Sequence, residues 1–309
     1  MAEVFVLLAT YNGRKYIAEM IDSVLAQDYQ DFHLIVSDDQ STDDTAGILE
    51  EYANKYPTVI THHRSNRRFG NAQDHFMYLL QTFHDAPYIM FCDQDDYWHS
   101  DKITKTIQLM KKIEQPGVPA MVHTDLRVVD RDLKELDSSF MHYSKLQGTR
   151  MSVSQLLAQN AVTGCTMMIN KALADLACDN MPKEEILMHD WWLALIAATM
   201  GTTGYLDEST IDYRQHGNNV VGAKKTRSLR YILGKLRNNE GRKQIRDTYQ
   251  QAALFYRCFS EKLGENERKL VKTYGDLPSL SVWKRRSMIV KCRYYKKGIT
   301  RILSQLICC

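Results

Sequence analysis

The stretch Tyr88-Ile89-Met90-Phe91-Cys92-Asp93-Gln94-Asp95-Asp96-Tyr97-Trp98 joins an apolar run to a cluster of three carboxylates. The run from Tyr88 to Cys92 has the length and composition of a buried β-strand, so the carboxylates emerge together from the carboxyl end of that strand. Oxygen ligands grouped in this way favour a hard divalent cation, and such a cation in turn favours phosphate. The stretch therefore predicts a metal site at the end of a buried strand.

Three alternative roles for the carboxylate cluster follow from its local pattern. A calcium loop beginning at Asp93 needs Gly at its sixth position and Glu at its twelfth, where the chain has Trp98 and Thr104, so it is excluded. In a phosphohydrolase, Asp93 would be the nucleophile and Asp95 the acid or base, although this strand is the fourth in the chain rather than the first. An Asp-rich turn before a helix, with Asp96 or Ser100 as the cap, also fits the local pattern.

Short apolar, β-rich runs alternate with helical patterns over the first part of the chain. The runs are 4–9, 32–37, 58–62, 88–92 and 121–123, and the helical patterns 17–25, 45–56 and 73–83 lie between the first four runs. Strands that alternate with helices predict an α/β fold with a mostly parallel sheet sandwiched by helices. Ligands bind such a sheet at the carboxyl ends of its strands.

Polar loops follow the first two predicted strands as well as the fourth. They are Thr10-Tyr11-Asn12-Gly13 and Ser37-Asp38-Asp39-Gln40-Ser41-Thr42-Asp43. Residues 41–44 fit a capped helix start, which leaves Asp39 as the candidate binding residue, while a simple Asn-Gly turn accounts for the first loop equally well. The chain has no G-x-G-x-x-G after the first strand and no G-x-x-x-x-G-K-[ST], so dinucleotide-binding and P-loop folds are excluded.

Three further segments carry candidate site residues beyond residue 150. Residues 159–165 precede a short apolar run and are expected to form a loop on the substrate side. Asp190 opens an apolar, helix-like stretch, where it is either an N-cap or a carboxylate held in the cleft, and both roles are compatible. A lone histidine such as His216 is more often structural than functional, although Arg214 and Asn218 beside it favour a functional role.

Taken in order, five motifs resemble the family 2 glycosyltransferases, which have a nucleotide-sugar-binding fold of the GT-A type. The motifs are Ala9–Gly13, Ser37–Asp43, Asp93–Trp98, His189–Trp192 and Arg214–Asn219. The resemblance covers about residues 1–220, and its specificity comes from the fixed order of several motifs. More narrowly, the chain looks like the bacterial rhamnosyltransferases that build cell-wall and capsular polysaccharide from dTDP-L-rhamnose. A UDP-sugar is the alternative donor.

The resemblance assigns the donor end of the site. Family members hold the base with the first loop and with the Asp after the second strand, which here selects Thr10, Tyr11, Asn12 and Asp39. A carboxylate accepts a hydrogen bond from N3–H of uracil or thymine, which suits Asp39. The resemblance further implies that Asp93 lies near the ribose or deoxyribose. It implies that Asp95 binds Mg²⁺ or Mn²⁺ at the diphosphate, with Asp96 as the second choice.

The resemblance also assigns the catalytic end. Asp190 matches the catalytic base, which takes a proton from the acceptor hydroxyl as that oxygen attacks the anomeric carbon and inverts it. Inversion of a β-linked rhamnose donor gives an α-linked product. The chain has His189 where the family usually has Glu, so the role of position 189 is open. His216 is expected on the metal side and Arg214 near phosphate. Trp191 or Trp192 is expected to wall the sugar site, while at least one of the two packs in the core.

Charge separates the chain into an acidic body and a basic extension. Residues 223–309 hold 22 Lys and Arg against 6 Asp and Glu, a net charge of +16, so residues 1–222 carry −13 of the total of +3. These ranges are the expected domains: a GT-A glycosyltransferase domain and a basic helical extension. A nucleic-acid-binding protein is disfavoured because the body is acidic and lacks spaced aromatic platforms. Nucleotidyl transfer is the closest alternative on this fold, although it needs a basic Gly-rich loop after the first strand.

The end of the extension predicts contact with a membrane surface. One helical stripe repeats at spacings of 3 and 4: Met288, Cys292, Tyr295, Ile299, Ile302 and Leu306. Basic residues lie opposite, and a basic amphipathic helix of this kind binds anionic lipid. Packing on the body or on a second subunit is the alternative, which leaves a homo-oligomer open.

The expected location follows from composition. No apolar run approaches the roughly 20 residues that span a bilayer, and the N-terminus lacks a basic n-region. The seven cysteines show no C-x-x-C spacing, so no zinc site or disulfide framework is expected and a reducing compartment fits. The sequence thus predicts a cytoplasmic enzyme, peripheral at the inner face of the cell membrane, that glycosylates a lipid-linked saccharide acceptor.

Overall fold

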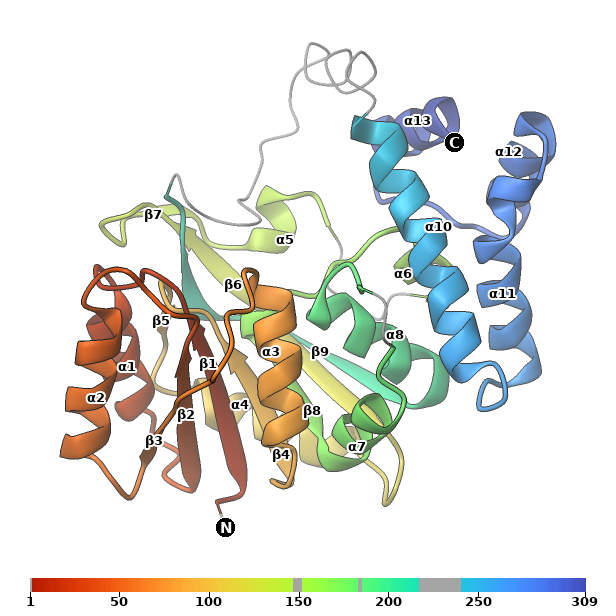
Figure 1. Ribbon diagram of the computed structural model, residues 1–309. Coiled ribbons are helices and arrows are strands. Elements are labelled where there is room, and N and C mark those ends of the chain that lie inside the picture. The colour runs from red at the N-terminus through yellow and green to blue at the C-terminus, as the bar shows by residue number, and fades with distance from the viewer. Residues whose placement is uncertain (1, 147–151, 183–184, 217–239) are drawn as a thin grey trace.

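A computed structural model describes residues 2–146, 152–182, 185–216 and 240–309. Its centre is a nine-stranded sheet with the order β3-β2-β1-β4-β8-β6-β9-β5, and β7 pairs with β6 (Figure 1). Helices cover both faces of the sheet, so the predicted sandwich architecture is confirmed.

The first half of the sheet consists of successive strand–helix units. Its elements are β1 Val4–Thr10, α1 Ile17–Leu25, β2 Phe32–Asp38, α2 Thr45–Lys55, β3 Ile60–His63, α3 Ala72–Thr82 and β4 Tyr88–Cys92. The pairs β1–β2, β1–β4 and β2–β3 are all parallel. The predicted strands and helices of this half are confirmed to within about two residues, which is the usual precision of element boundaries.

The second half makes the sheet mixed. Its elements are β5 Tyr97–Trp98, α4 Lys102–Ile113, β6 Ala120–Val129, β7 Glu135–Asp137, α5 Phe140–Tyr143, α6 Val153–Ala158, β8 Met167–Asn170, α7 Lys171–Asp179, α8 His189–Met200 and β9 Thr202–Arg214. Strand β8 lies between β4 and β6 and is antiparallel to both, whereas β6 and β9 are parallel. The short β5 pairs antiparallel with β9 and so brings the segment after β4 next to the end of β9.

Alternate side chains of the strands feed two hydrophobic clusters, one on each face of the sheet. Val4, Val6 and Leu8 join the cluster that contains the buried side of α1, and Leu7 joins the cluster that contains α3 and α8. This alternation is the period of two that a pleated strand imposes. Both faces of β1 are therefore buried, which explains its continuous apolar run.

The C-terminal extension is helical and packs on the α8 side of the sheet (Figure 1). It consists of α10 Glu240–Phe259, α11 Glu265–Gly275, α12 Val282–Lys291 and α13 Ile299–Cys308. The rings of Phe255 and Phe259 on α10 lie 5.2 and 5.9 Å from the ring of Trp192 on α8. The described part of the extension thus shares its core with the body. The expected boundary at 222/223 lies outside the described residues, as does Asn218.

The prediction of one continuous amphipathic helix at the end of the chain is wrong. Helix α12 ends at Lys291 and α13 begins at Ile299, with Arg293 (φ 56°) and Gly298 (φ 94°) in left-handed conformations between them. Most of the predicted stripe packs against the body, since Met288, Cys292, Tyr295 and Leu306 all contact the core. The spacing of the apolar residues could not reveal the break, because apolar residues before and after it pack against the same core.

Among the described residues, no helix combines the length and the apolar character that crossing a bilayer requires.

Candidate active site

One cavity of about 1350 Å³ collects the loops at the carboxyl ends of β1, β2 and β4. It continues past the N-terminus of α8 and ends against α10 and α13. Thr10, Asp39, Asp93, Asp95 and Asp190 all line it. The topology explains this convergence, because parallel strands release their loops at the same edge of a sheet.

The first two loops are tied together by hydrogen bonds. Asn12 (φ 50°) accepts a hydrogen bond on its Oδ1 from the Thr42 backbone N–H at 2.8 Å, and its own N–H donates to Ser41 Oγ at 2.7 Å. The Thr10 hydroxyl donates to Asp38 Oδ1 at 3.0 Å. Thr10 and Asn12 therefore fix the positions of the first two loops relative to each other.

Asp39 is buried at the side of the cavity with only 4% of its surface exposed. Its two carboxylate oxygens accept backbone N–H groups of Phe69 and Gly70, the second at 2.8 Å. A carboxylate oxygen has two lone pairs, so each retains one for a donor in the cavity. At the mouth, the Tyr11 hydroxyl accepts from Arg68 at 2.7 Å, and the guanidinium lies 4.8 Å from the ring centre.

Gln94 joins the first loop to the carboxylate loop. Its side-chain amide accepts from the Tyr11 N–H at 2.9 Å and donates to the Tyr11 carbonyl at 3.0 Å. A Cβ at position 13 would overlap Gln94 Oε1, so Gly13 leaves the room that this pairing needs. Sequence reasoning missed this role, because nothing local marks a glutamine between two aspartates as the partner of a backbone 83 residues away.

The three carboxylates of the cluster differ in their exposure to the cavity. Asp93 and Asp95 line the cavity, whereas Asp96 is fully buried beneath it. Desolvation raises the pKa of Asp93 to about 7, and the negative charges of Asp95 and Asp190 add to the effect. Asp95 Oδ2 lies 2.6 Å from Nε2 of His216, which is stacked on Tyr16.

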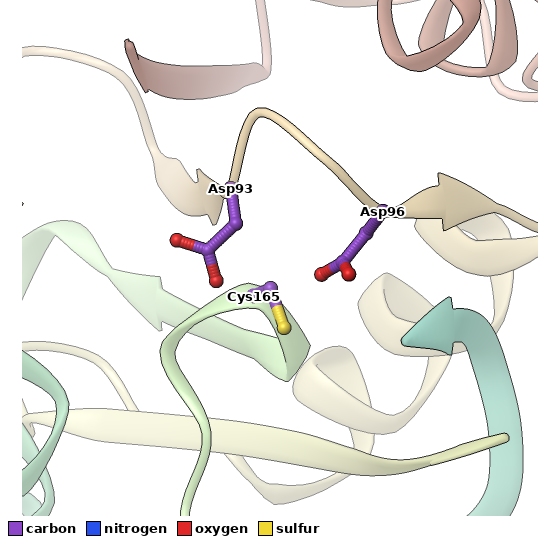
Figure 2. Close-up of side chains that lie close together, drawn as sticks. All are labelled: Asp93, Asp96 and Cys165. Atoms are coloured by element: carbon purple, nitrogen blue, oxygen red, sulfur yellow. The ribbon is translucent and has the colours of Figure 1, made fainter. Parts of the chain in front are cut away.

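Asp96 forms part of a buried group with Asp93 and Cys165, which lies in the turn of 3-10 helix before β8 (Figure 2). One ligand atom from each residue lies within 4.8 Å of the others. Lys102 is buried beside this group, and burial lowers its pKa to about 8, opposed by Cys165, Cys92 and Asp96. Lys102 Nζ has no hydrogen-bond partner among the described residues. A thiol is a poor ligand for Mg²⁺ or Mn²⁺.

The donor set that fits a hard divalent cation is therefore the one on the cavity side. It consists of the Asp95 carboxylate and the His216 imidazole, and Asp93 lines the same cavity. Carboxylate oxygen and imidazole nitrogen both suit Mn²⁺, and open space beside them leaves positions for phosphate oxygens. Asp96, the second choice from sequence, instead accepts the backbone N–H of Arg214 at 3.1 Å.

Asp190 lies in the first turn of α8 and is held by three donors. Asn160 Nδ2 and the Gly164 N–H donate to its two oxygens at 3.0 and 3.1 Å, and the Trp191 N–H donates as well. Burial nevertheless raises the pKa of its carboxyl to about 7, against the pull of these hydrogen bonds. The predicted loop of residues 159–165 does line the cavity and supplies two of the donors.

His189, beside Asp190, forms part of the cavity floor. Its ring packs on Phe76 and Phe91, with centroids 4.5 and 5.3 Å away, and its Nε2 lies against Gly164. Burial lowers the pKa of the imidazole to about 3, so it is neutral. Neither ring nitrogen has a hydrogen-bond partner among the described residues.

Two of the predicted site residues have other roles in the structure. Trp192 is fully buried in the core against α10, and it is Trp191 that lines the cavity. The guanidinium of Arg214 donates to the carbonyls of Asp95 and Arg131 at 2.8 and 2.7 Å and pairs with Glu19 at 2.5 Å. Arg214 therefore clamps the loop that carries Asp95. It is not among the residues that line the cavity, so its position lends no support to the predicted phosphate contact.

The model of the family described as Glycosyl transferase family 2 matches residues 5–177. A dTDP-rhamnosyl transferase, RfbG of Shigella flexneri, is 31% identical over 252 residues, covering 77% of this chain and 82% of that protein. The chain belongs to glycosyl transferase family 2, so it is a glycosyltransferase rather than a phosphohydrolase or a nucleotidyltransferase.

Solved structures share the fold of the whole chain. The first 349 residues of Staphylococcus aureus TarS, in complex with UDP-GlcNAc, superpose with a TM-score of 0.57 at 16% identity, covering 99% of this chain and 90% of that one. The mannosyltransferase PcManGT from Pyrobaculum calidifontis, in complex with GDP-Man and Mn²⁺, gives 0.55 at 16% identity, with coverage of 99% and 85%. These likenesses confirm the predicted GT-A fold.

Proposed function

We propose that this glycosyltransferase inverts the anomeric centre of L-rhamnose as it transfers the sugar from dTDP-L-rhamnose to a lipid-linked glycan of a cell wall or capsule. The observation that carries the reaction type is the placement of Asp190 in the same cavity as Asp93 and Asp95. A buried carboxylate whose pKa is near 7 is suited to accept a proton at neutral pH. The identity with RfbG supports the rhamnosyl donor.

In the proposed reaction, the acceptor hydroxyl oxygen attacks the anomeric carbon while the bond from that carbon to the diphosphate oxygen breaks. Asp190 takes the hydroxyl proton, and the pair of electrons from the broken bond leaves on the nucleoside diphosphate. Asn160, Gly164 and Trp191 hold the carboxylate in position through their three hydrogen bonds. Attack opposite the leaving group converts a β-linked donor into an α-linked product.

The donor end is assigned to the rim formed by the first two loops. Asp39 has lone pairs for N3–H of thymine, and Tyr11 with Arg68 provides an aromatic and cationic wall at the mouth. Mg²⁺ or Mn²⁺ would be held by Asp95 and His216. When bound, the cation neutralises charge that develops on the departing diphosphate.

The acceptor end is assigned to the side of the cavity beyond Asp190. Trp191 lines it on the body, and Gln244 and Asp247 of α10 with Thr300 and Ser304 of α13 line it on the extension. Amide, carboxylate and hydroxyl groups beside an aromatic ring are suited to the hydroxyls and apolar face of a saccharide. The extension thus takes part in the proposed site, and we place the enzyme at the cytoplasmic face of the membrane, where lipid-linked acceptors are reached.

The test compares dTDP-L-rhamnose, UDP-GlcNAc and GDP-mannose as donors with and without Mn²⁺. Thermal unfolding in the presence of dTDP, UDP or GDP measures binding without an acceptor, because a ligand of the native state raises its apparent stability. We expect the largest Mn²⁺-dependent shift with dTDP, and rhamnosyl transfer with the matching donor. A larger shift with UDP or GDP would reject dTDP-L-rhamnose as the donor. It would still be consistent with a glycosyltransferase that uses another nucleotide sugar.

A further inference from the structure

Helix α13 presents three sides with different chemistry. Ile299, Leu303 and Ile307 are spaced by four residues, so they form one row along the helix, and they are 77, 54 and 52% exposed. Thr300 and Ser304, one position further along, line the cavity. A third side, with Gln305 and Cys308, is buried, and Gln305 Nε2 donates to the Tyr294 carbonyl at 2.8 Å.

Helix α12, which contacts α13 through Arg286, has exposed apolar side chains of its own. Trp283 is 79% exposed and Val290, two turns later on the same side, is 50% exposed. Arg286 joins the two helices, because its guanidinium lies 5.5 Å from the centre of the Trp283 ring while its Nε donates to the Leu306 carbonyl at 2.7 Å. The apolar surface of α12 and α13 is defined here as Trp283, Val290, Ile299, Leu303 and Ile307.

This surface is unusual for the molecule. Among the described residues, six of the eight large hydrophobic side chains that are exposed lie in α12 and α13. Scattered apolar residues are normal on a protein surface, but a contiguous group marks a contact site. The side chains that the core needs from this region, such as Ile289 on α12 and Tyr294 in the connection to α13, are already buried, so the exposed group is not left over from core packing.

The charge around the apolar surface favours an anionic partner. Residues 277–309 contain eight Lys and Arg and no Asp or Glu. Lys284, Lys291, Arg293 and Lys297 are exposed beside the apolar surface. A second copy of the chain would bring the same positive charge against itself, which costs energy, whereas an anionic bilayer attracts each of these cations.

We propose that α12 and α13 dock on an anionic bilayer, with the apolar surface at the boundary between headgroups and acyl chains. Because Thr300 and Ser304 follow Ile299 and Leu303 directly, docking would hold the acceptor end of the cavity at the lipid headgroups. A lipid-linked acceptor would then enter from the membrane surface. The entry of the acceptor from the membrane rests on the proposed function, whereas lipid docking itself does not.

The test measures binding of the whole chain to vesicles by co-sedimentation. Vesicles of phosphatidylglycerol with phosphatidylethanolamine are compared with vesicles of phosphatidylcholine alone. The double variant Leu303→Glu/Ile307→Glu places two charges in the apolar row, and Leu136→Glu is the matched control, because Leu136 is also exposed but lies on β7. We expect the double variant to bind the anionic vesicles at least about tenfold more weakly and the control to bind as the wild type does.

Three results would overturn the proposal. They are wild-type binding by the double variant, equal binding to both kinds of vesicle, and a dimer in sedimentation velocity that the double variant dissociates. The third would assign the surface to a second copy of the chain. The thermal shift with dTDP is measured on every variant, since an unchanged shift shows that the fold and the donor site are intact. Failure of lipid docking and failure of the proposed donor are then separate outcomes.

Discussion

The imidazole of His216 lies 2.6 Å from the carboxylate of Asp95, although 121 residues separate them in the sequence. Antiparallel pairing of Tyr97 with Asp212 brings the two segments together, and the backbone N–H of Arg214 donates to Asp96 just before His216. The proximity of Asp95 and His216 therefore depends on the sheet, because the end of β9 pairs with β5, the short strand that follows the carboxylates.

Removing either member of this pair is expected to weaken cation-dependent nucleotide binding. His216→Ala and Asp95→Ala each delete one ligand, so the extra thermal stabilisation by dTDP that Mn²⁺ provides falls, which corresponds to binding about tenfold weaker or worse. The matched control is His142→Ala, since His142 forms a similar pair with Asp137 at 3.0 Å, away from the cavity. An unchanged Mn²⁺ effect in both site variants would reject the assignment.

Replacing the proposed base is expected to separate chemistry from binding. Asp190→Asn keeps the size of the side chain but removes the proton acceptor, so kcat falls about 10²- to 10⁴-fold. The dTDP thermal shift stays close to that of the wild type, because Asp190 lies on the proposed acceptor side of the cavity. Transfer within about tenfold of the wild-type rate would contradict a role in proton removal.

The sequence alone predicted the half of the fold that depends on local pattern. The units from β1 to β4 follow from apolar runs separated by helical periods, and Asp39, Asp93 and Asp95 follow from their position after those runs. It could not predict that β8 enters between β4 and β6, because antiparallel insertion depends on pairing between distant segments. The alternation of strands and helices that guided the prediction also stops there.

Residue roles within the motifs were harder to predict than the motifs themselves. Arg214 lies in the expected segment, but its partners are the carbonyls of residues 95 and 131 and the carboxylate of Glu19, which no local pattern names. The same holds for Trp191 and Trp192, because adjacent helical positions differ by 100° and the side that faces the cavity depends on where α10 packs. These choices are made by tertiary contacts.

The two adjacent tryptophans are expected to behave differently. Trp192→Ala leaves a cavity beside Phe255 and Phe259 and lowers the free energy of unfolding by about 3–5 kcal/mol. Trp191→Ala lowers it less and mainly raises KM for the acceptor, because the ring lines the proposed acceptor end. Urea denaturation and initial rates measure the two effects. A larger loss of stability in Trp191→Ala than in Trp192→Ala would show that Trp191, and not Trp192, is the core residue.

Arg214→Met tests the clamp on the metal-side loop. Methionine fills similar space but donates no hydrogen bond, so two carbonyls and one carboxylate lose their partner and the free energy of unfolding falls by about 2–4 kcal/mol. The Mn²⁺ effect on dTDP binding falls as well, because the Asp95 backbone is released. Glu19→Gln is the control, since it leaves both carbonyl contacts in place. A normal Mn²⁺ effect in Arg214→Met would show that the loop needs no clamp.

Replacing Asn160 is expected to shift the pH profile of kcat/KM, because Asn160 donates a hydrogen bond to Asp190. A base acts only when ionised, so kcat/KM rises with pH and levels off above the pKa of Asp190, which burial raises to about 7. The Asn160 hydrogen bond favours the ionised carboxylate. Asn160→Ala therefore raises this pKa and moves the acid limb toward higher pH by about one unit, while activity at high pH recovers.

Asn180→Ala is the matched control for this shift, because Asn180 donates to the Leu176 carbonyl at the end of α7, away from the cavity. A purely structural loss in Asn160→Ala would lower the whole profile without moving it along the pH axis. An unmoved acid limb in that variant would mean that the rise in kcat/KM reports a group other than Asp190. A limb that moves to lower pH would contradict the sign of the hydrogen-bond effect itself.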